Sequence, residues 1–333
     1  MARRTRVLLV RPNRSSFMDQ DEVLLRRHYD VRTLDMYAIP RGGLYAPRFL
    51  VRLSRDVHWA DVVVSWFADR HSATAGLLSR MLGAQCVLIV GGYEAAKVPE
   101  IGYGSLLSDK GARTVGKALR RAHLVLAVSE FTKHELESNL NFSGAKVVYN
   151  CVGPDFVPGD APKERLVVMV ANTLSSTRRL KGLDTFAQAS ALVPDARFVL
   201  VGPNDEETAE ALKVMAPSLE ITGQVTHDEV VAWMKRAKVY CQTSYRESFG
   251  IAVAEAMACA CVPVVTKGGA LPEVVGDVGF YVEYGDAKAT AEAITHALRS
   301  DKGPKARERV QGMFSMERRE SALTTVIDSL AAE

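Results

Sequence analysis

The stretch RLVVMVANTLSSTRRLKGLDTFAQASALVPDARFVLVG, residues 165–202, indicates the fold class of the chain. An unbroken apolar run is followed by a polar loop, an amphipathic helical stretch and a second apolar run. Strands that are apolar on both sides are typical of parallel sheets with helices on both faces. Because the same alternation recurs along the chain, it predicts an α/β protein built from doubly wound parallel sheets.

The length of the chain and one break in this pattern predict two domains. At 333 residues the chain exceeds the usual single-domain size, so two domains of about 150 residues each are expected. Three prolines and two glycines interrupt the pattern in NCVGPDFVPGDAPKE, residues 150–164. We therefore expect one domain over residues 1–158 and a second over 159–313. Residues 314–333 have the pattern of an amphipathic helix long enough to cross back to the first domain.

Composition excludes several classes of protein. Hydrophobic residues make up 47% and charged residues 24% of the chain, which is ordinary for a soluble globular protein. No segment approaches the roughly 18 uninterrupted apolar residues of a membrane span. The basic start followed by a short apolar run does not fit a secretory leader and is typical of a first strand. Together with five cysteines that lack metal-site spacing, these features predict a cytoplasmic protein.

Charge is distributed unevenly. Residues 1–158 hold 22 lysines and arginines against 15 aspartates and glutamates, whereas residues 159–333 hold 20 against 24. Such an excess can draw the first half toward an anionic acceptor or a membrane surface, although a solvated arginine-rich surface is the simpler interpretation. We expect no nucleic-acid partner.

Peripheral contact with the inner face of a membrane is one alternative for LYAPRFLVRLSRDVHWA, residues 44–60. Apolar residues and arginines alternate there as they do in an interfacial helix. A core-facing helix with arginines on its solvent side has the same pattern, and we favour that interpretation.

Chemistry-bearing residues gather in RESFGIAVAEAMACACVPVVTKGGALPE, residues 246–273. This segment follows a predicted strand. Glu247 lies in the loop before the next helix, and Glu255 lies inside that helix. Ligands of open α/β sheets bind at the carboxyl ends of the strands, and carboxylates accept hydrogen bonds from vicinal hydroxyls. The helix start adds free backbone N–H groups. These are expected at Ser248, Phe249, Gly250 and Ile251. This layout suits a nucleotide sugar, which has hydroxyls at both ends and phosphates between them.

Two further loops fit the same ligand. The pair Gly268 and Gly269 follows a strand, and glycines there allow the backbone to approach a diphosphate. Arg178, Arg179 and Lys181 lie in a loop after another strand, where cations neutralise charge on a leaving phosphate. A solvated basic loop is the alternative, but we favour a functional role for Lys181.

Together these residues resemble the retaining nucleotide-sugar glycosyltransferases of glycosyltransferase family 4. That family has the GT-B fold, in which two Rossmann-like domains face each other across a cleft. The resemblance is specific over residues 165–284 and looser in the first half. It is carried by Lys181-Gly182, by Glu247 through Glu255, and by GGALPEVVGDVGFYV at the end.

The resemblance implies a role for each site residue. Glu247 contacts the donor sugar and Glu255 the ribose hydroxyls. Lys181, with Arg178 or Arg179, stabilises the departing nucleoside diphosphate. Backbone amides at Gly268 and Gly269 hold the diphosphate, and the base stacks near Gly223, Gln224 and Val225.

The chain departs from the family pattern at three places. The arginine that the family commonly has six residues before the lysine is Ser175 here. A glycine-rich turn after the first strand is replaced by VRPNRSSFMDQ, residues 10–20. The histidine that many members have after the fourth strand is replaced by Gly91-Gly92-Tyr93-Glu94, so we expect different chemistry at the acceptor site.

The expected reaction moves a hexosyl group from a nucleoside diphosphate sugar to a hydroxyl of a glycan, glycolipid or small glycoside, with retention of configuration. No Asp-x-Asp pair ends a strand near the diphosphate loops, and Asp205 with the two glutamates after it fits a helix cap and first-turn acids. We therefore expect no metal ion and no cofactor.

Two loops of the first half are candidates for the carbohydrate or glycolipid acceptor. Aromatic rings stack on sugar faces and carboxylates bind hydroxyls, which assigns His71, Tyr93 and Glu94 to the acceptor. Alternatively, Asp69, two residues before His71, is an ordinary helix cap and His71 a polar residue on a helix surface.

Other functions stay open at the level of sequence. A nucleotide-sugar epimerase shares the two-domain layout and the donor class, and a noncatalytic nucleotide-sugar-binding protein would use the same site without turnover. A dinucleotide oxidoreductase is disfavoured because no G-x-G-x-x-G follows the first strand of either domain.

Overall fold

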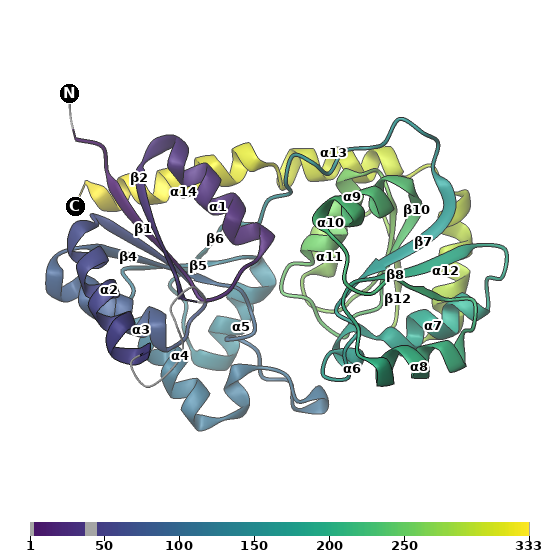
Figure 1. Cartoon of the computed structure of the whole chain (residues 1–333), viewed down its shortest axis with the longest axis horizontal. Helices are drawn as coiled ribbons and strands as arrows, with labels where there is room; N and C mark the ends of the chain where they lie inside the picture. The colour runs from purple at the N-terminus through teal and green to yellow at the C-terminus, as the bar shows by residue number, and fades with distance from the viewer. Residues whose placement is uncertain (1–2, 37–44, 333) are drawn as a thin grey trace. The chain divides into compact units, whose positions relative to one another are not determined.

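Two parallel β-sheets organise the chain, one in each of two units (Figure 1). The computed structural model describes residues 3–36 and 45–332. The first unit comprises Met1–Cys151 and Met316–Glu333, and the second comprises Val152–Ser315. The observed boundary follows Cys151, whereas the sequence pattern placed it after residue 158. The Val152 N–H donates to the Phe314 carbonyl at 2.9 Å, which ties the linker to the second unit.

The first unit contains a six-stranded sheet in the order β2-β1-β3-β4-β5-β6. Its strands are β1 (Arg6–Arg11), β2 (Asp30–Asp35), β3 (Val62–Trp66), β4 (Gln85–Val90), β5 (Leu124–Ala127) and β6 (Ala145–Val147). Its helices are α1 (Ser16–His28), α2 (Tyr45–Trp59), α3 (Arg70–Leu82), α4 (Asp109–Arg121), α5 (Glu130–Leu140) and α14 (Met316–Ala331). Ser65 of β3 bonds Ser72 of α3, whereas the next residue, Trp66, bonds Asp21 of α1. Because adjacent strand residues point to opposite faces, α1 and α3 cover opposite faces of this sheet.

A buried ion pair fixes α14 in the first unit. Arg319 and Asp21 have side chains that are 1% and 0% exposed, and an Arg319 Nη2 to Asp21 Oδ2 bond of 2.8 Å joins α14 to α1. The same guanidinium donates to the Tyr149 carbonyl at 2.6 Å, and Trp66 Nε1 donates to Asp21. A desolvated charge pair of this kind is sensitive to geometry, because loss of either partner leaves a buried charge.

The second unit has a sheet in the order β12-β11-β10-β7-β8-β9. Its strands are β7 (Glu164–Val170), β8 (Arg197–Val201), β9 (Glu220–Ile221), β10 (Ala237–Gln242), β11 (Val262–Thr266) and β12 (Phe280–Val282). Its helices are α6 (Arg178–Lys181), α7 (Leu183–Ala191), α8 (Glu206–Met215), α9 (His227–Arg236), α10 (Ile251–Ala258), α11 (Leu271–Val275), α12 (Ala287–Arg299) and α13 (Gly303–Met313).

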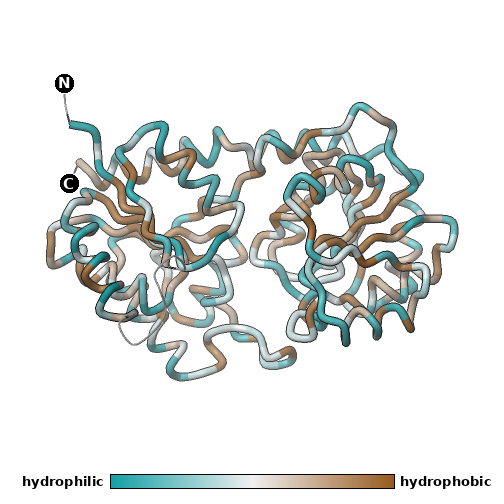
Figure 2. Tube along the Cα trace, in the orientation of Figure 1, coloured by the Kyte–Doolittle hydropathy of each residue, from teal (hydrophilic) through white to brown (hydrophobic). Residues whose placement is uncertain are grey.

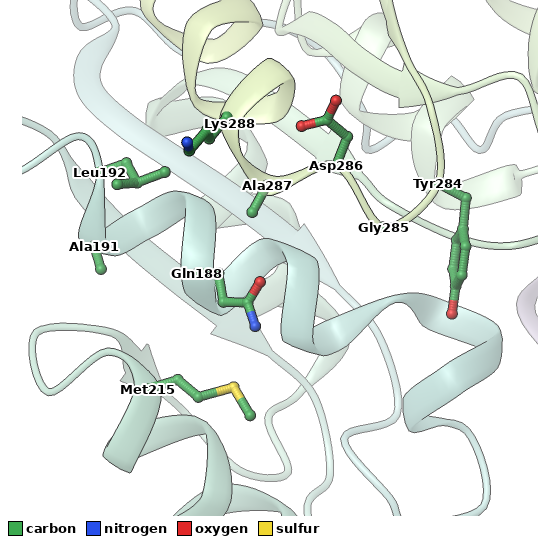
Figure 3. Close-up of a pocket in the computed structure, with 9 residues that line it drawn as sticks. All are labelled: Gln188, Ala191, Leu192, Met215, Tyr284, Gly285, Asp286, Ala287 and Lys288. Carbon is green, nitrogen blue, oxygen red and sulfur yellow. The ribbon is translucent and has the colours of Figure 1, made fainter.

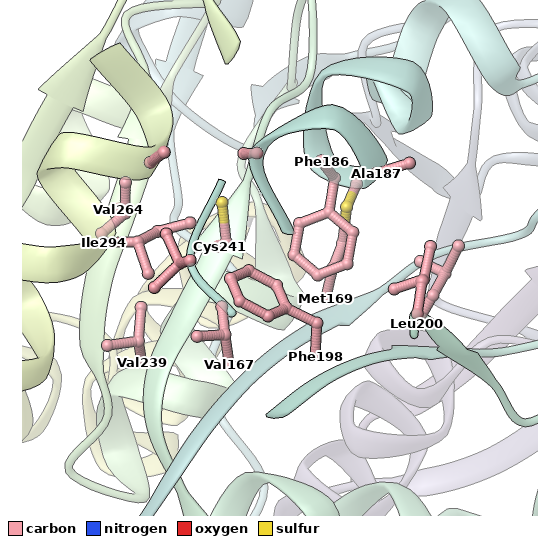
Figure 4. Close-up of a cluster of buried hydrophobic side chains, with 14 of the residues drawn as sticks. Val167, Met169, Phe186, Ala187, Phe198, Leu200, Val239, Cys241, Val264 and Ile294 are labelled. Atoms are coloured by element: carbon pink, nitrogen blue, oxygen red, sulfur yellow. The ribbon is translucent and has the colours of Figure 1, made fainter. Parts of the chain in front are cut away.

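Apolar strands form the cores, as Figure 2 shows along both sheets. In the second unit, side chains of β7, β8 and β10 pack against α7 and α12, with Phe186 and Phe198 at the centre (Figure 4). Their ring centroids lie 5.7 Å apart. The predicted α/β class with two parallel sheets is confirmed.

The order of strands in the second sheet reverses between β7 and β10. From β7 the chain adds β8 and β9 on one side, and it then crosses to add β10, β11 and β12 on the other. Loops that leave the carboxyl ends of β7 and β10 therefore diverge, and such a switch point is where open α/β sheets bind ligands.

Helix α2 is core-facing, as we favoured from the sequence. Phe49, Leu53 and Val57 are buried, and its arginines lie on the exposed side. Leu50 and Val51 on that side are 45% and 71% exposed. Over residues 3–36 and 45–332, no helix combines the length and the apolar character needed to cross a bilayer.

Candidate functional site

An ion pair lies at the switch point of the second sheet. Lys181 ends α6, in the connection that follows β7, and Glu247 lies in the loop that follows β10. Lys181 Nζ is 2.7 Å from Glu247 Oε1, and the two side chains are 24% and 15% exposed. The structure thus brings together two of the predicted site residues from loops far apart in sequence.

Hydrogen bonds to main-chain carbonyl groups hold these two loops together. Tyr245 N–H donates to the Leu180 carbonyl at 2.8 Å, and Thr243 Oγ1 donates to the Gly182 carbonyl at 2.9 Å. Gly182 has φ +63°, and a Cβ there would lie 2.0 Å from the Thr243 carbonyl oxygen. Only glycine fits at this contact, so the glycine after Lys181 is required for the lysine to reach Glu247.

A polar network orients the Glu247 carboxylate. Ser244 Oγ donates to Glu247 Oε1 at 2.7 Å, and Gln242 Nε2 donates to the same oxygen at 3.2 Å. Tyr240 donates its hydroxyl to Gln242 at 2.9 Å. The hydrogen bonds from Lys181, Gln242 and Ser244 all end on Oε1 of this carboxylate. The other oxygen, Oε2, accepts no hydrogen bond from the described residues. Oε2 is therefore available to a ligand hydroxyl.

The Gly268-Gly269 turn packs on the Glu247 loop. Glu247 N–H donates to the Gly268 carbonyl at 3.3 Å, and Ala270 N–H donates to the Glu247 carbonyl at 2.8 Å. A Cβ on Gly268 would lie 2.3 Å from the Tyr245 carbonyl oxygen, and one on Gly269 would lie 2.1 Å from that of Glu247. These glycines therefore have a packing role that the sequence did not reveal, beside the predicted contact with a diphosphate.

Helix α10 begins beside this turn. Gly250 adopts φ +89° at its N-cap, and the Gly250 and Ile251 N–H groups form no hydrogen bond with other described residues. Phe249 is buried, with its ring centroid 5.2 Å from that of Phe314, and Ser248 Oγ accepts from Arg246 at 3.2 Å. The side chain of Phe249 is thus part of the core, whereas the first amides of α10 are open to a polar ligand.

Glu255 is the fifth residue of α10 and is only 7% exposed. Its carboxyl group forms no hydrogen bond or ion pair with any residue whose position is described. Burial raises the pKa of Glu255 to about 8. A buried carboxyl group without a partner is costly, so ligand hydroxyls in this position would satisfy it.

A cavity of about 300 Å³ extends from Lys181 to the loop after β9. Its lining residues are Val170, Ala171, Asn172, Lys181, Val201, Gly202, Pro203, Gln224, Val225 and Val230. Its walls combine valine side chains with the polar side chains of Asn172, Lys181 and Gln224. Gln224 and Val225, near which we predicted the base to stack, line this cavity, whereas Gly223 turns at φ +74° and pairs with Gly202 instead.

The two arginines before Lys181 have different surroundings. Arg178 Nε bonds Asp184 Oδ1 at 2.6 Å and is thereby neutralised. Arg179 is exposed, and its guanidinium forms no salt bridge within the described ranges.

Ser175 N–H donates to Asp205 at 2.7 Å, and hydrogen bonds from Thr208 and Ser175 lower the pKa of Asp205 to about 2. Asp205 therefore caps α8, as predicted.

Glu94, predicted to contact the acceptor, is buried and bonded to the main chain. It is 4% exposed, and its carboxylate accepts hydrogen bonds from the N–H groups of Ala68, Gly91 and Gly92 at 3.0–3.1 Å. Burial raises the pKa of Glu94, and these amides oppose the shift. Glu94 therefore joins the loops after β3 and β4. The two glycines just before Glu94, whose N–H groups it binds, are the sequence feature that could have indicated this structural role.

His71 is also buried, at 4% exposure, and lies on neither a helix surface nor an open site. Its Nε2 is 2.7 Å from the Trp66 carbonyl oxygen, and burial lowers the pKa of the ring. Tyr93 is 51% exposed and its ring centroid lies 5.0 Å from that of Tyr103. Of the three predicted acceptor residues, Tyr93 alone presents its side chain to solvent. Asp69 stands at the N-cap of α3 but makes no side-chain cap bond.

A second hollow in this unit, of about 700 Å³, is formed by α7, α8 and the start of α12 (Figure 3). It contains none of the predicted site residues, and its lining includes Gln188, Met215, Tyr284 and Lys288. Across the part of the chain that the structure describes, no group of three or more histidine, cysteine, aspartate or glutamate side chains is arranged to hold a metal ion.

Two family models match the chain. The one described as Glycosyltransferase Family 4 matches residues 1–156, and the one described as Glycosyl transferases group 1 matches residues 164–300.

Curated relatives match part of the chain. It is 28% identical to N-acetyl-alpha-D-glucosaminyl L-malate synthase of Bacillus anthracis over 182 residues, which cover 50% of this chain and 46% of that protein. It is 32% identical to D-inositol 3-phosphate glycosyltransferase of Mycobacterium tuberculosis over 155 residues, which cover 43% of this chain and 32% of that protein. The chain thus spans about half, or less, of the length of these relatives.

Solved structures match almost the whole chain. Sucrose-phosphate synthase from Thermosynechococcus elongatus has a TM-score of 0.80 at 19% identity, covering 99% of this chain and 100% of that chain. Anabaena HepE in complex with UDP and glucose has a TM-score of 0.78 at 17% identity, covering 98% and 100%. At these identities the likeness shows a shared fold.

Replacing Glu255 by Gln is expected to flatten the dependence of stability on pH. The folded-state pKa of about 8 lies above the ordinary 4.5, so the unfolded chain releases this proton first as pH rises. Wild-type stability is therefore expected to fall, by a few kcal/mol relative to Glu255→Gln, between about pH 4.5 and pH 8. Thermal unfolding of the ligand-free protein across this range measures the difference. Glu292→Gln, on the exposed side of α12, is the control, and parallel profiles for Glu255→Gln and wild type would contradict the assignment.

Proposed function

Because the chain belongs to glycosyltransferase family 4 and has the GT-B fold, we propose that it transfers a hexosyl group from a nucleoside diphosphate sugar to an acceptor hydroxyl. The observation that carries the proposal is the Lys181–Glu247 pair at the switch point, 2.7 Å long and next to the cavity that leads to Gln224 and Val225. A cation for phosphate and a carboxylate for hydroxyls thus lie side by side.

The residues of the second unit match the parts of such a donor in turn. The cavity beside Val225, with apolar and amide side chains in its wall, suits the base, and the unpartnered carboxyl group of Glu255 suits the ribose hydroxyls. Lys181, Arg179 and the first amides of α10 supply positive charge and N–H donors for the diphosphate. Glu247 Oε2 accepts a hydrogen bond from a hydroxyl of the sugar. We assign Arg179 rather than Arg178 because Asp184 already neutralises the latter.

The proposed transfer retains the anomeric configuration. The acceptor oxygen attacks the anomeric carbon on the face from which the diphosphate leaves. The bond from that carbon to the phosphate oxygen breaks as the new glycosidic bond forms, and the acceptor proton passes to the leaving phosphate. Lys181 stabilises the charge that develops on the leaving group, and Glu247 orients the sugar without forming a bond to it.

Solved neighbours that contain UDP and glucose, or UDP-glucose, support a uridine diphosphate sugar as the first donor to test. For the acceptor we propose a carbohydrate or glycolipid, with Tyr93 as the exposed aromatic ring that a sugar face would contact. We also propose a cytoplasmic site of action, with Leu50 and Val51 of α2 available for contact with the membrane that holds a glycolipid.

Loss of the Lys181 ammonium is expected to weaken binding of the nucleoside diphosphate. A screen by thermal shift over UDP, GDP, ADP and their sugars identifies the ligand, because a bound donor stabilises the fold. Lys181→Gln is then expected to raise Kd for that diphosphate by about 10- to 100-fold and to leave binding of the nucleoside unchanged, since one charge-assisted hydrogen bond is lost. Lys213→Gln, on the exposed surface of α8, is the matched control. If wild type and Lys181→Gln bind the diphosphate with equal affinity, Lys181 does not contact the diphosphate.

Transfer is expected to proceed without a divalent metal ion. Lys181, Arg179 and backbone amides carry the phosphate charge in the proposed site, so EDTA is expected to change the rate of sugar transfer by less than about twofold. Incorporation of labelled sugar into lipid and glycan fractions of a lysate, with and without EDTA, measures this. Activity that is abolished by EDTA and restored by magnesium or manganese would overturn metal independence while leaving the transferase assignment in place.

A further inference from the structure

A basic groove lies between α3 and α4 of the first unit, two helices that pack side by side (Figure 1). It has a volume of about 570 Å³. Its lining residues are Arg70, Ala73 and Thr74 of α3, and Lys110, Arg113, Thr114, Lys117 and Arg121 of α4. Five of these eight side chains are cationic and none is acidic. We call it the α3–α4 groove.

The positive charge of the groove is not neutralised by the protein. None of its five cations forms a salt bridge with a residue in the described parts of the chain. Elsewhere in the same unit arginines are paired with acids. These include Arg3, Arg6, Arg11, Arg26 and Arg27. Asp69 and Asp109, the acids at the starts of the two helices, are exposed and pair with no groove cation.

Hydrogen bonds position two of the five cations. Arg121 Nη1 donates to the Ala73 carbonyl at 2.9 Å, across the groove, and Arg113 Nε donates to the Asp109 carbonyl at 3.2 Å. The side chains of Arg70, Lys110 and Lys117 donate no hydrogen bond to the described protein. Their donors are free for a ligand.

The spacing of the cations on α4 places them on one helix face. Lys110, Arg113, Lys117 and Arg121 follow one another at intervals of three and four residues. Like charges at these intervals are neighbours on the helix surface and destabilise it by a few tenths of a kcal/mol per pair. An anion bound between the helices would offset this repulsion. The intervals between these four cations are readable in the sequence.

Close packing between the middle of α3 and the C-terminal end of α4 bounds the groove. A Cβ on Gly76 of α3 would lie 3.0 Å from the Cβ of Arg121, so the helices touch there. Nearer the N-terminal ends of the two helices, Ala73 and Thr74 of α3 line the hollow together with Arg113 and Thr114 of α4.

We propose that the α3–α4 groove binds a phosphate group, carried either by a lipid head group or by a soluble phosphorylated ligand. Guanidinium groups bind phosphate through paired N–H donors, and lysines add point charges. The volume of about 570 Å³ exceeds that of a phosphate ion and leaves room for the rest of such a ligand. The inference is independent of the proposed donor site, none of whose residues lines the groove.

Exposed apolar side chains near the groove make the lipid source the first to test. Leu77, Met81 and Leu82 of α3 are 39%, 70% and 41% exposed, and α2, which packs against α3, exposes Val51. A bilayer would cover such residues, whereas a soluble ligand would not.

The test compares a groove variant with a variant of equal charge. Arg113→Gln with Lys117→Gln removes two exposed cations of the groove, and Lys146→Gln with Lys305→Gln removes two exposed cations elsewhere. Co-sedimentation with phosphatidylcholine vesicles, with and without about a third phosphatidylglycerol, probes the lipid source. Calorimetric titration with inorganic phosphate and with glycerol phosphate probes the soluble source. Both are run on the full chain at about 150 mM salt.

Wild-type binding to anionic vesicles alone would assign the groove to a lipid head group, and binding to the phosphates alone would assign it to a soluble ligand. If the lipid is the ligand, the groove variant is expected to bind anionic vesicles about 30-fold more weakly than wild type. If a soluble phosphate is the ligand, the groove variant is expected to bind it more than about tenfold more weakly. In both cases the affinity of the control variant is expected to change by less than about twofold. The proposal fails if wild type binds none of the probes, or if both variants lose equally. The groove variant is expected to bind a nucleoside diphosphate with the affinity of wild type. A failure of the groove proposal can therefore be distinguished from a failure of the proposed donor site.

Discussion

The ion pair between Lys181 and Glu247 joins the segments that follow β7 and β10, the strands at which the second sheet reverses its order. Neither charge is fully exposed, so their attraction is stronger than it would be in bulk water. Under the proposed function the diphosphate competes with Glu247 for the lysine, and the carboxylate turns to the sugar. The pair therefore holds a cation for phosphate and a carboxylate for hydroxyls side by side.

Glycines make this contact possible. Gly182 and Gly269 have positive φ values, and in each case a Cβ would clash with the carbonyl oxygen of the neighbouring loop, at 2.0 and 2.1 Å. Gly268 is limited in the same way at 2.3 Å. These contacts fix Glu247 between the turn after β11 and the segment after β7. The site is thus set by main-chain packing as much as by its charged side chains.

The fold was predictable because buried parallel strands are continuous apolar runs, such as Leu166–Val170. Glu247 and Lys181 were recognisable because they follow such strands, but their direct contact depends on which loops meet when the sheet order reverses. The main-chain bonds of Glu94 were not predictable, because a carboxylate after a strand has the same sequence pattern whether it faces solvent or accepts main-chain N–H groups. His71 was misplaced because the burial of a helix's first turn depends on the tertiary packing around it.

In the proposed function, one nucleoside diphosphate sugar spans this switch point, with acidic side chains at its two ends. A crystal structure of the protein with the donor selected by the nucleotide screen tests this arrangement. We expect the Glu255 carboxyl group within hydrogen-bond reach of the ribose hydroxyls, the diphosphate beside Lys181, and a hydroxyl of the sugar bonded to Glu247 Oε2. A donor bound elsewhere, or bound there with both carboxyl groups turned away from it, would overturn the proposed function.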